Sequence, residues 1–326
     1  MDFELSDDQV ALQEGIRNLC EGRFDIETVR GFADTAGVDR SRWAELGETG
    51  VFGLSVDEAV GGLGLGLSDV VLVFEELGRA AIPGPLVASL LAAGIANGAV
   101  DGAIDGTAVV GLIEHNGGTG PWMVEHLDAL DSLLVLFDNR VDLVSVSELS
   151  GQALEQPLDP LTPVHRVAEL PAGSELGGAE MAADLRLRGT IVTAALQLGL
   201  AEAALALGVS FAKEREQFGK PIGSFQAIKH LCADMLTHVE VTRAAVYAAA
   251  VHFDQPDTGN VERAAAGAKL LASQAGSFCG KTCTQIHGGM GYTWEVDAHL
   301  YLKRSWVLDT VFGDTEHHAE TVASFL

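Results

Sequence analysis

The sequence predicts a mainly α-helical protein with a small β-rich domain in its middle. Apolar residues recur at helical spacing near both ends of the chain, and short apolar runs typical of strands lie between them. Aromatic residues make up only 6% of the 326 residues, which favours closely packed helices over a sandwich of aromatic-rich strands. We expect an N-terminal helical domain over residues 1–98, a β-rich domain over residues 99–184 and a C-terminal four-helix bundle over residues 185–326.

Helical patterns recur within the first 98 residues. Ser6 precedes two aspartates and Gln9, as in a capping box, and apolar residues follow at helical spacing. Residues 43–46 and 70–77 are two further amphipathic stretches, and the glycine-rich run at residues 61–66 lies between them. No strand pattern precedes this run and no Lys-Ser or Lys-Thr pair follows it, so we interpret it as a flexible connection instead of a phosphate-binding loop.

The remaining elements follow from changes of period along the chain. Apolar runs bounded by Gly, Asp and Asn predict strands, and the return of helical periodicity predicts long helices separated by loops that contain Gly and Pro. The predicted strands cover residues 108–113, 132–137 and 143–146. The predicted helices cover residues 185–214, 226–253, 261–284 and 296–311. Helices of this length, placed after a β-rich domain and able to pack antiparallel, imply a bundle.

Acidic residues outnumber basic ones. With 46 Asp and Glu against 20 Lys and Arg, the formal net charge is -26, which would repel a nucleic-acid backbone or an anionic membrane. The N-terminal sequence is acidic where a signal peptide is basic and then apolar, and no run of ~18 uninterrupted apolar residues occurs, so we expect a cytoplasmic protein. Cys279 and Cys283 lie four residues apart, but no second pair completes a metal site, and we expect no bound metal.

The first segment with candidate binding chemistry ends a predicted helix. Arg215, Gln217 and Phe218 stand there, directly before a Gly-Lys-Pro turn. A guanidinium binds a pyrophosphate, an amide binds a base or a ribose, and an aromatic ring stacks on an adenine, so this combination suits a dinucleotide. A helix C-terminus whose arginine interacts with the helix dipole, and whose phenylalanine packs in the core, would have the same sequence.

The second segment interrupts a later helix. Gln285 is followed by Gly288, Gly289 and Gly291. Glycines permit a close approach of the backbone, and the amide groups exposed there could bind a phosphate or a ribose. We interpret residues 294–297, directly after the glycines, as packing residues. Alone, this glycine pattern has low specificity.

Together and in this order, the two segments resemble the acyl-CoA dehydrogenase family. The resemblance rests on residues 215–219, 225–226 and 285–292, and on N-terminal landmarks at residues 43–47, 61–64 and 74–79. It implies an α domain, a small β domain and a four-helix bundle, with FAD held between subunits. It also implies an acyl-CoA substrate and an electron-transfer protein as the acceptor.

The resemblance also assigns cofactor-binding residues. In the family, the two motifs reach across a subunit interface to the ADP half of a neighbour's FAD. The residues that inherit this role are Arg215, Gln217, Phe218, Gln285, Gly288 and Gly289. Thr315 is a further candidate cofactor contact. The nearby His317 and His318 either contact FAD or a partner, or are exposed residues near the end of the chain.

One departure from the family concerns the flavin ring. Family members carry Thr-Glu-Pro-like and Trp-Ile-Thr-like segments that contact the ring. Here residues 112–118 are Leu-Ile-Glu-His-Asn-Gly-Gly, and nothing similar to Trp-Ile-Thr precedes Leu185. A flavin ring needs hydrogen-bond donors around its N1, O2 and N5 edge, so the comparison with the family predicts that this chain's own ring site is degraded.

The other departure concerns the catalytic base. The reaction of the family removes a proton α to a thioester, which requires a carboxylate. Many members place a Glu in a Tyr-Glu-Gly-Thr-like motif, and the corresponding residue here is Gly313. Other members supply the Glu from the end of the helix after the first motif, where Asp254 is either the base or a solvated helix-end carboxylate. Arg243, in the middle of that helix, is either solvent-facing or a family-like active-site arginine.

Three functions are compatible with these features. The first is the shorter subunit of a heteromeric (α2β2) acyl-CoA dehydrogenase, similar to actinobacterial ones, in which a homologous partner supplies the ring contacts and the base. Similar split enzymes act on bulky acyl-CoA substrates such as steroid side chains. The second function is a self-sufficient homo-oligomeric dehydrogenase with Asp254 as base, and the third is a non-catalytic helical scaffold. The retained dinucleotide-binding motifs favour the first over the third.

Overall fold

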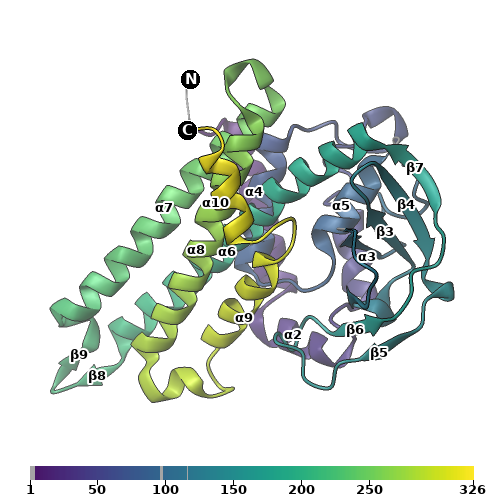
Figure 1. The fold of residues 1–326 in the computed structure, drawn as a ribbon. Coiled ribbons are helices and arrows are strands. Elements are labelled where there is room, and N and C mark those ends of the chain that lie inside the picture. The colour runs from purple at the N-terminus through teal and green to yellow at the C-terminus, as the bar shows by residue number, and fades with distance from the viewer. Residues whose placement is uncertain (1–3, 96–97, 116) are drawn as a thin grey trace. The chain divides into compact units, whose positions relative to one another are not determined.

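The computed structural model describes residues 4–95, 98–115 and 117–326. The described chain forms two compact units, each assembled from separated segments. The first unit consists of the residues up to Ile26, Val71–Ile82 and Thr190–Leu326, and the second consists of Glu27–Val70 and Pro83–Gly189. The mainly α-helical class with a small part in strands is confirmed (Figure 1). The division into three consecutive domains stays a prediction, because it follows the order of the chain and these units do not.

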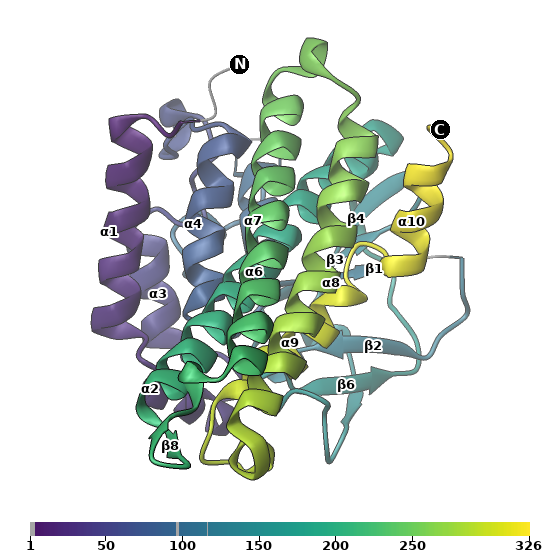
Figure 2. The ribbon, with the colours of Figure 1, turned by 90° about the vertical axis from the view of Figure 1, so that its left-hand side faces the viewer.

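Helices make up most of the first unit (Figures 1 and 2). They are α1 (Asp7–Arg23), the end of α4 (Leu67–Arg79), most of α6 (Ala179–Glu214), α7 (Gln226–Asp254), α8 (Val261–His287), α9 (Ala298–Asp309) and α10 (Thr315–Ala323). The helices α7 and α8 pack along each other, and both α9 and α10 pack on α8. The predicted C-terminal helices are therefore present, and the short helix α10 follows them.

Local sequence explains where two of these helices begin. The Ser6 side chain accepts a hydrogen bond from the Gln9 N–H, and the Gln9 side chain accepts one from the Ser6 N–H, which completes the predicted capping box of α1. The Asn260 side chain accepts a 2.8 Å hydrogen bond from the Arg263 N–H and caps α8. Each cap satisfies a backbone donor that has no partner within the helix.

The helix α6 is 36 residues long. By length and composition alone it could cross a bilayer, but 78% of its most apolar 18-residue window is buried inside the protein, as in a core helix. The helices α6 and α4 cross closely at two glycines, Gly199 on α6 and Gly78 on α4. A Cβ on either glycine would overlap main-chain atoms of the other helix. The absence of side chains at these two positions lets the backbones approach closely.

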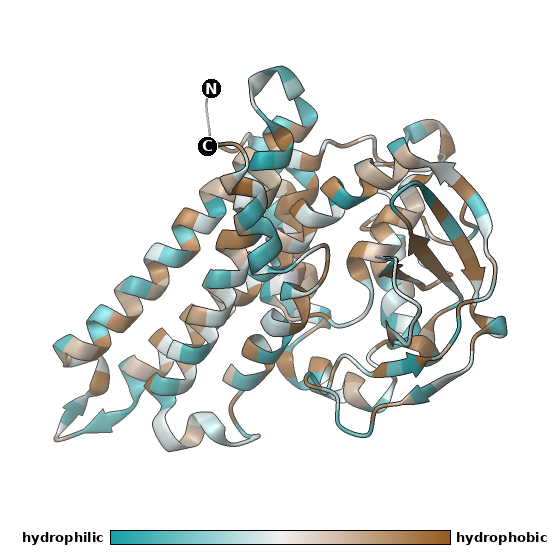
Figure 3. Cartoon of the chain, viewed as in Figure 1, coloured by the Kyte–Doolittle hydropathy of each residue, from teal (hydrophilic) through white to brown (hydrophobic). Residues whose placement is uncertain are grey.

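The second unit combines short helices with two sheets. Its helices are α2 (Ile26–Gly31), α3 (Arg40–Glu48) and α5 (Leu86–Gly94). Its strands are β1 (Val110–Glu114), β2 (Trp122–Glu125), β3 (Ser132–Leu136), β4 (Arg140–Ser145), β5 (Gly151–Ala153), β6 (Val164–Val167) and β7 (Ser174–Gly178). One sheet has the order β1-β3-β4-β7, with β1 parallel to β3, and the other has the antiparallel order β2-β6-β5. The strand β3 is hydrophobic and mostly buried (Figure 3).

Candidate functional site

The two C-terminal motifs meet at a cleft of about 490 Å³ in the first unit. The hairpin after α6 and the turn after α8 lie at the same end of the long helices (Figures 1 and 2). Residues of both line the cleft. Its lining residues are Phe211, Arg215, Gln217, Ile222, Ile286, His287, Gly289 and Met290. Three of the predicted cofactor-binding residues, Arg215, Gln217 and Gly289, are therefore brought together.

A tight hairpin positions the first motif. The strands β8 (Glu216–Gln217) and β9 (Lys220–Pro221) pair antiparallel and follow the end of α6. At the tip, Phe218 and Gly219 have φ angles of 56° and 76°, and two such left-handed residues are typical of a two-residue hairpin. Phe218 is 91% exposed, so its ring projects from the tip and is available for stacking. The alternative in which this ring packs in the core is wrong.

Glycines shape the second motif. The helix α8 ends at His287, and Gly288, with φ of 60°, forms its C-cap before the short 3-10 helix η8 (Gly288–Tyr292). No atom lies within 4 Å of a Cβ built on Gly288 or Gly289, so the backbone there is open to a ligand. A Cβ on Gly291 would instead overlap the Thr284 carbonyl group, so this glycine is required for packing. Gln285, on the last turn of α8, is exposed.

Five residues of the cleft were not among the predicted site residues, and two of these five have aromatic rings in contact with each other. Phe211 and His287 stack on each other, with ring centroids 4.1 Å apart and planes inclined by 25°. Phe211 precedes Arg215 by four positions, a helical spacing that places both on one face and is the signal that sequence reasoning could have used. His287 directly precedes the glycines, but only the structure shows that its side chain lines the same cleft.

Comparisons with known proteins decide the family. The pattern described as "Acyl-CoA dehydrogenase, N-terminal domain" matches residues 6–101, and "Acyl-CoA dehydrogenase, C-terminal domain" matches residues 178–326. The acyl-CoA dehydrogenase IpdE2 of Mycobacterium tuberculosis is 35% identical over 308 residues, which cover 90% of this chain and 89% of IpdE2. The chain belongs to the acyl-CoA dehydrogenase family.

Solved structures share the fold of this acyl-CoA dehydrogenase. The ChsE4-ChsE5 complex from Mycobacterium tuberculosis superposes with a TM-score of 0.86 at 24% identity, over 99% of this chain and 98% of that chain. The Tcur3481-Tcur3483 steroid ACAD superposes with a TM-score of 0.82 at 24% identity, over 98% of this chain and 97% of that chain. The predicted fold, the assignment as an FAD-dependent acyl-CoA dehydrogenase and FAD as its cofactor are confirmed.

The cleft of this acyl-CoA dehydrogenase fits the ADP half of FAD. Arg215 is exposed, and among the described residues it has no carboxylate within ion-pair distance, so its guanidinium is available for a pyrophosphate. The open backbone at Gly288 and Gly289 gives a phosphate or a ribose room to approach. Ile222, Ile286 and Met290 provide the apolar surface that a base requires.

The turn between α9 and α10 contains the position at which the family resemblance expects the catalytic Glu. Gly313 has φ of 90°, a conformation that a Glu adopts only with strain. A Cβ on Gly313 would lie 2.6 Å from Cδ2 of His317 and 3.1 Å from Nε2 of His318. The turn of this acyl-CoA dehydrogenase is therefore formed around a residue without a side chain.

Buried groups hold this turn in place. Lys269, which is fully buried on α8, donates through Nζ to the carbonyl oxygens of Leu308, at 2.9 Å, and Asp309, at 3.1 Å, and to that of Gly313 at 3.4 Å. His318 donates through Nε2 to the Phe312 carbonyl oxygen at 2.8 Å. His318 is buried, so it is not the exposed residue that one interpretation of the sequence expects.

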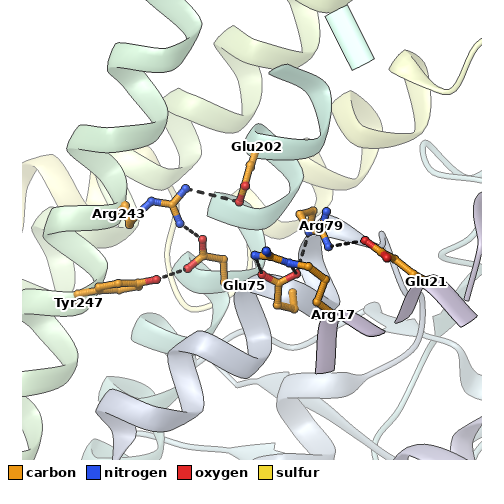
Figure 4. A network of polar contacts seen from close by, with 8 residues as sticks. Arg17, Glu21, Glu75, Arg79, Glu202, Arg243 and Tyr247 are labelled. Atoms are coloured by element: carbon orange, nitrogen blue, oxygen red, sulfur yellow. Dashed lines mark hydrogen bonds and ion pairs between the residues drawn. The ribbon is translucent and has the colours of Figure 1, made fainter. Parts of the chain in front are cut away.

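Three further candidates do not line the cleft. Thr315 donates a 2.8 Å hydrogen bond to Asp309 Oδ1 at the start of α10. Asp254 is exposed at the C-terminal end of α7. The 29 residues of this helix rise about 1.5 Å each, so Asp254 lies roughly 40 Å from Gln226, the first residue of α7. Arg243 forms an ion pair with the buried Glu75 and is not a freely solvated residue (Figure 4). The cofactor role of Thr315 and the catalytic roles of Asp254 and Arg243 stay predictions.

One other expectation is corrected by the environment of the side chain, and two cysteines have a shifted pKa. Trp294 is 64% exposed and is not a packing residue of the core; its ring meets His299 edge-on and lies 4.5 Å from Lys303 Nζ. Burial raises the pKa of the Cys279 and Cys283 thiols to about 12, so both stay protonated at neutral pH.

Proposed function

We propose that this chain is the subunit of a heteromeric acyl-CoA dehydrogenase that contributes the ADP side of an inter-subunit FAD site to a homologous catalytic partner. The observation that carries the proposal is the cleft in which Arg215 and Gln217 of the first motif meet Gly289 of the second. FAD supplies the hydride acceptor for α,β-dehydrogenation of the acyl-CoA thioester when it is bound. Arg215 would hold the pyrophosphate and Gln217 the base or the ribose, and the exposed Phe218 ring at the hairpin tip would be available to stack on the adenine.

The turn at Gly313 supports the assignment of the base to the partner. The dehydrogenation would require a carboxylate that removes the proton α to the thioester carbonyl. A Glu at Gly313 would need a strained backbone and the space that His317 and His318 fill. Thr315 also uses its hydroxyl within this turn. The partner then supplies both the ring contacts and the carboxylate.

The proposal includes an assembly and a substrate class. Solved structures with this fold include the ChsE4-ChsE5 complex and the Tcur3481-Tcur3483 steroid ACAD, which motivate an α2β2 assembly and a bulky acyl-CoA such as one with a steroid side chain. An electron-transfer protein would reoxidise the flavin. The net charge of -26 suits work in the cytoplasm away from nucleic acid and anionic membranes.

The first experiment is purification of this chain alone and together with any acyl-CoA dehydrogenase homologue that is encoded beside it, expressed in the same cells. Visible flavin absorption that appears only in the co-purified heteromer supports the proposal. A yellow homo-oligomer that oxidises an acyl-CoA by itself overturns it and favours the self-sufficient enzyme, in which Asp254→Asn should abolish turnover. A heteromer that binds no flavin leaves only the scaffold function.

A second experiment tests the role of the cleft in that heteromer. Arg215→Ala should lower the flavin content of the purified complex by about tenfold at limiting FAD, since a charge-assisted contact to the pyrophosphate is lost. Arg263→Ala is the matched control, because Arg263 is another exposed arginine of the first unit and does not line the cleft. Equal flavin content in the two variants would remove Arg215 from the cofactor site.

A further inference from the structure

One polar side chain of the cleft has no role in the proposed function. His287 lies on the last turn of α8, lines the cleft and is only 6% exposed. Its neighbours in the lining are mostly apolar or belong to the two motifs. A polar ring at such a position must satisfy its nitrogen atoms within the protein or through a ligand.

The hydrogen bonds of the ring fix the position of one proton. Nδ1 of His287 lies 2.8 Å from the main-chain carbonyl oxygen of Cys283. A carbonyl oxygen only accepts, so Nδ1 carries the hydrogen and donates it. In the neutral imidazole, this leaves Nε2 with a lone pair and makes it an acceptor. The stacking on Phe211 holds the plane of the ring, so the direction of the Nε2 lone pair is fixed as well.

The second nitrogen is open to a ligand. Among the residues that the structure describes, Nε2 of His287 has no hydrogen-bond partner, because both polar contacts of the ring involve Nδ1. Several side-chain nitrogen and oxygen atoms of the described residues are fully enclosed and have no hydrogen-bond partner, but Nε2 of His287 is not one of them. Nε2 is therefore not fully enclosed by protein atoms. Since the cleft is the open space that His287 lines, Nε2 is directed at whatever occupies the cleft.

The chemistry of Nε2 selects a part of the dinucleotide. Phosphate oxygens only accept hydrogen bonds, so a lone pair repels them, and Arg215 on the same cleft already suits the pyrophosphate. The adenosine part offers donors: the exocyclic amino group of the adenine and the hydroxyl groups of the ribose. A guanine or a hypoxanthine presents a carbonyl oxygen in place of that amino group.

We infer that His287 Nε2 accepts a hydrogen bond from the adenine amino group or from the ribose 2′-hydroxyl group of the adenosine in the cleft, and that His287 thereby makes the site discriminate against nucleotides that lack this donor. The inference rests on the proposed function, because it places the ADP half of FAD in this cleft. The positioning of Nε2 by Cys283 and Phe211 makes His287 a specificity-determining residue and more than a packing residue.

Calorimetric titration of the full chain with ADP, inosine diphosphate and 2′-deoxy-ADP tests the inference. Wild type should bind ADP about tenfold more tightly than inosine diphosphate if the amino group is the donor, or than 2′-deoxy-ADP if the 2′-hydroxyl group is the donor. His287→Phe keeps a ring that can stack on Phe211 but lacks Nε2. In this variant the affinity for ADP should fall to that for the disfavoured analogue, so the discrimination disappears.

Two further variants separate recognition from folding. His287→Gln places an amide near the position of Nε2 and should restore part of the discrimination. His238→Phe is the matched control, because His238 also lies against a phenylalanine of the helices, with ring centroids 4.3 Å apart, and does not line the cleft. The control should bind all three nucleotides as wild type does, and circular dichroism confirms that each variant is folded.

The outcomes distinguish this inference from the function on which it rests. If wild type binds ADP but His287→Phe binds and discriminates equally well, the inference is overturned and the proposed function stands. The same holds if wild type does not discriminate among the three nucleotides. If neither wild type alone nor its co-purified heteromer binds ADP, both fall.

Discussion

The Tyr247 hydroxyl group donates a 2.7 Å hydrogen bond to Glu75 Oε2 and so connects α7 to a carboxylate that is fully buried on α4 (Figure 4). Arg243, one turn earlier on α7, pairs with the other oxygen of Glu75. The adjacent Glu76 is also fully buried and binds Arg17 and Arg79. Buried carboxylates persist only when they are paired, so these contacts join helices from both ends of the chain within the first unit.

Removal of Arg243 should therefore destabilise the protein through the charge that it leaves behind. Arg243→Met should lower the free energy of unfolding by about 3–5 kcal/mol, because the Glu75 carboxylate would then be buried without a counter-ion. Adding Glu75→Gln removes that charge and should recover a large part of the loss. Urea denaturation of both single variants and the double variant measures the coupling. A double variant no more stable than Arg243→Met would show that this ion pair does not hold the helices together.

The buried His318 predicts a pH dependence of stability. Burial first, and the nearby Lys269 ammonium second, lower the pKa of His318 to about 4. The unfolded chain takes up the proton near its ordinary pKa of about 6.5, so stability is fully present above that pH and falls as the pH drops from there toward 4. One pKa unit corresponds to about 1.4 kcal/mol, so uptake of this one proton lowers the free energy of unfolding by about 3 kcal/mol.

His318→Gln tests this pH dependence. Glutamine retains a donor for the Phe312 carbonyl oxygen and does not titrate. Unfolding free energies measured from pH 7 to pH 4 should therefore fall less steeply in this variant than in wild type. The control is His230→Gln at another exposed position of the first unit, which should keep the wild-type slope. Identical slopes for wild type and His318→Gln would assign the acid sensitivity to other groups.

Lys269 should stabilise the turn between α9 and α10. Lys269→Met removes the ammonium group from the carbonyl oxygens of Leu308, Asp309 and Gly313, and it should lower the free energy of unfolding by about 3 kcal/mol. It should also raise the pKa of His318, because the charge that opposes its protonation is lost. Lys281→Met, at an exposed position of the same helix, is the control. An NMR titration in which the His318 pKa is unchanged in Lys269→Met would contradict this coupling.

Strong local patterns made much of the fold predictable. The capping box at Ser6 and the helical periodicity after residue 185 correspond to α1 and the C-terminal helices, because caps and amphipathic faces act over a few residues. The strands β2, β5, β6 and β7 were not predicted, since they are short and several are exposed or polar. Such strands are stabilised by pairing with distant segments, which a local pattern does not contain.

The site was predictable where chemistry and spacing coincide. Arg215, Gln217 and Gly289 could be proposed because a dinucleotide needs these groups, and the structure places them on one cleft. The contribution of His287 depends on a helix carbonyl group and on Phe211, which is distant in sequence. The buried Glu75 could not be recognised either, because a Glu in an amphipathic helix is usually exposed and its partners come from other helices.

Close helix crossings have no sequence signature of their own, yet they lead to a matched pair of glycine substitutions. A Cβ on Gly199 of α6 would overlap the main chain of α4 at Glu75, where no flexible side chain can move away. Gly199→Ala should therefore lower the free energy of unfolding by about 1–3 kcal/mol or more through overpacking. Gly267, in the middle of α8, has no atom within 4 Å of an added Cβ, so Gly267→Ala should raise stability by about 0.5–1 kcal/mol. Thermal and urea denaturation of the two variants measure the contrast, and a Gly199→Ala variant as stable as wild type would mean that α4 and α6 can separate at this crossing at little cost.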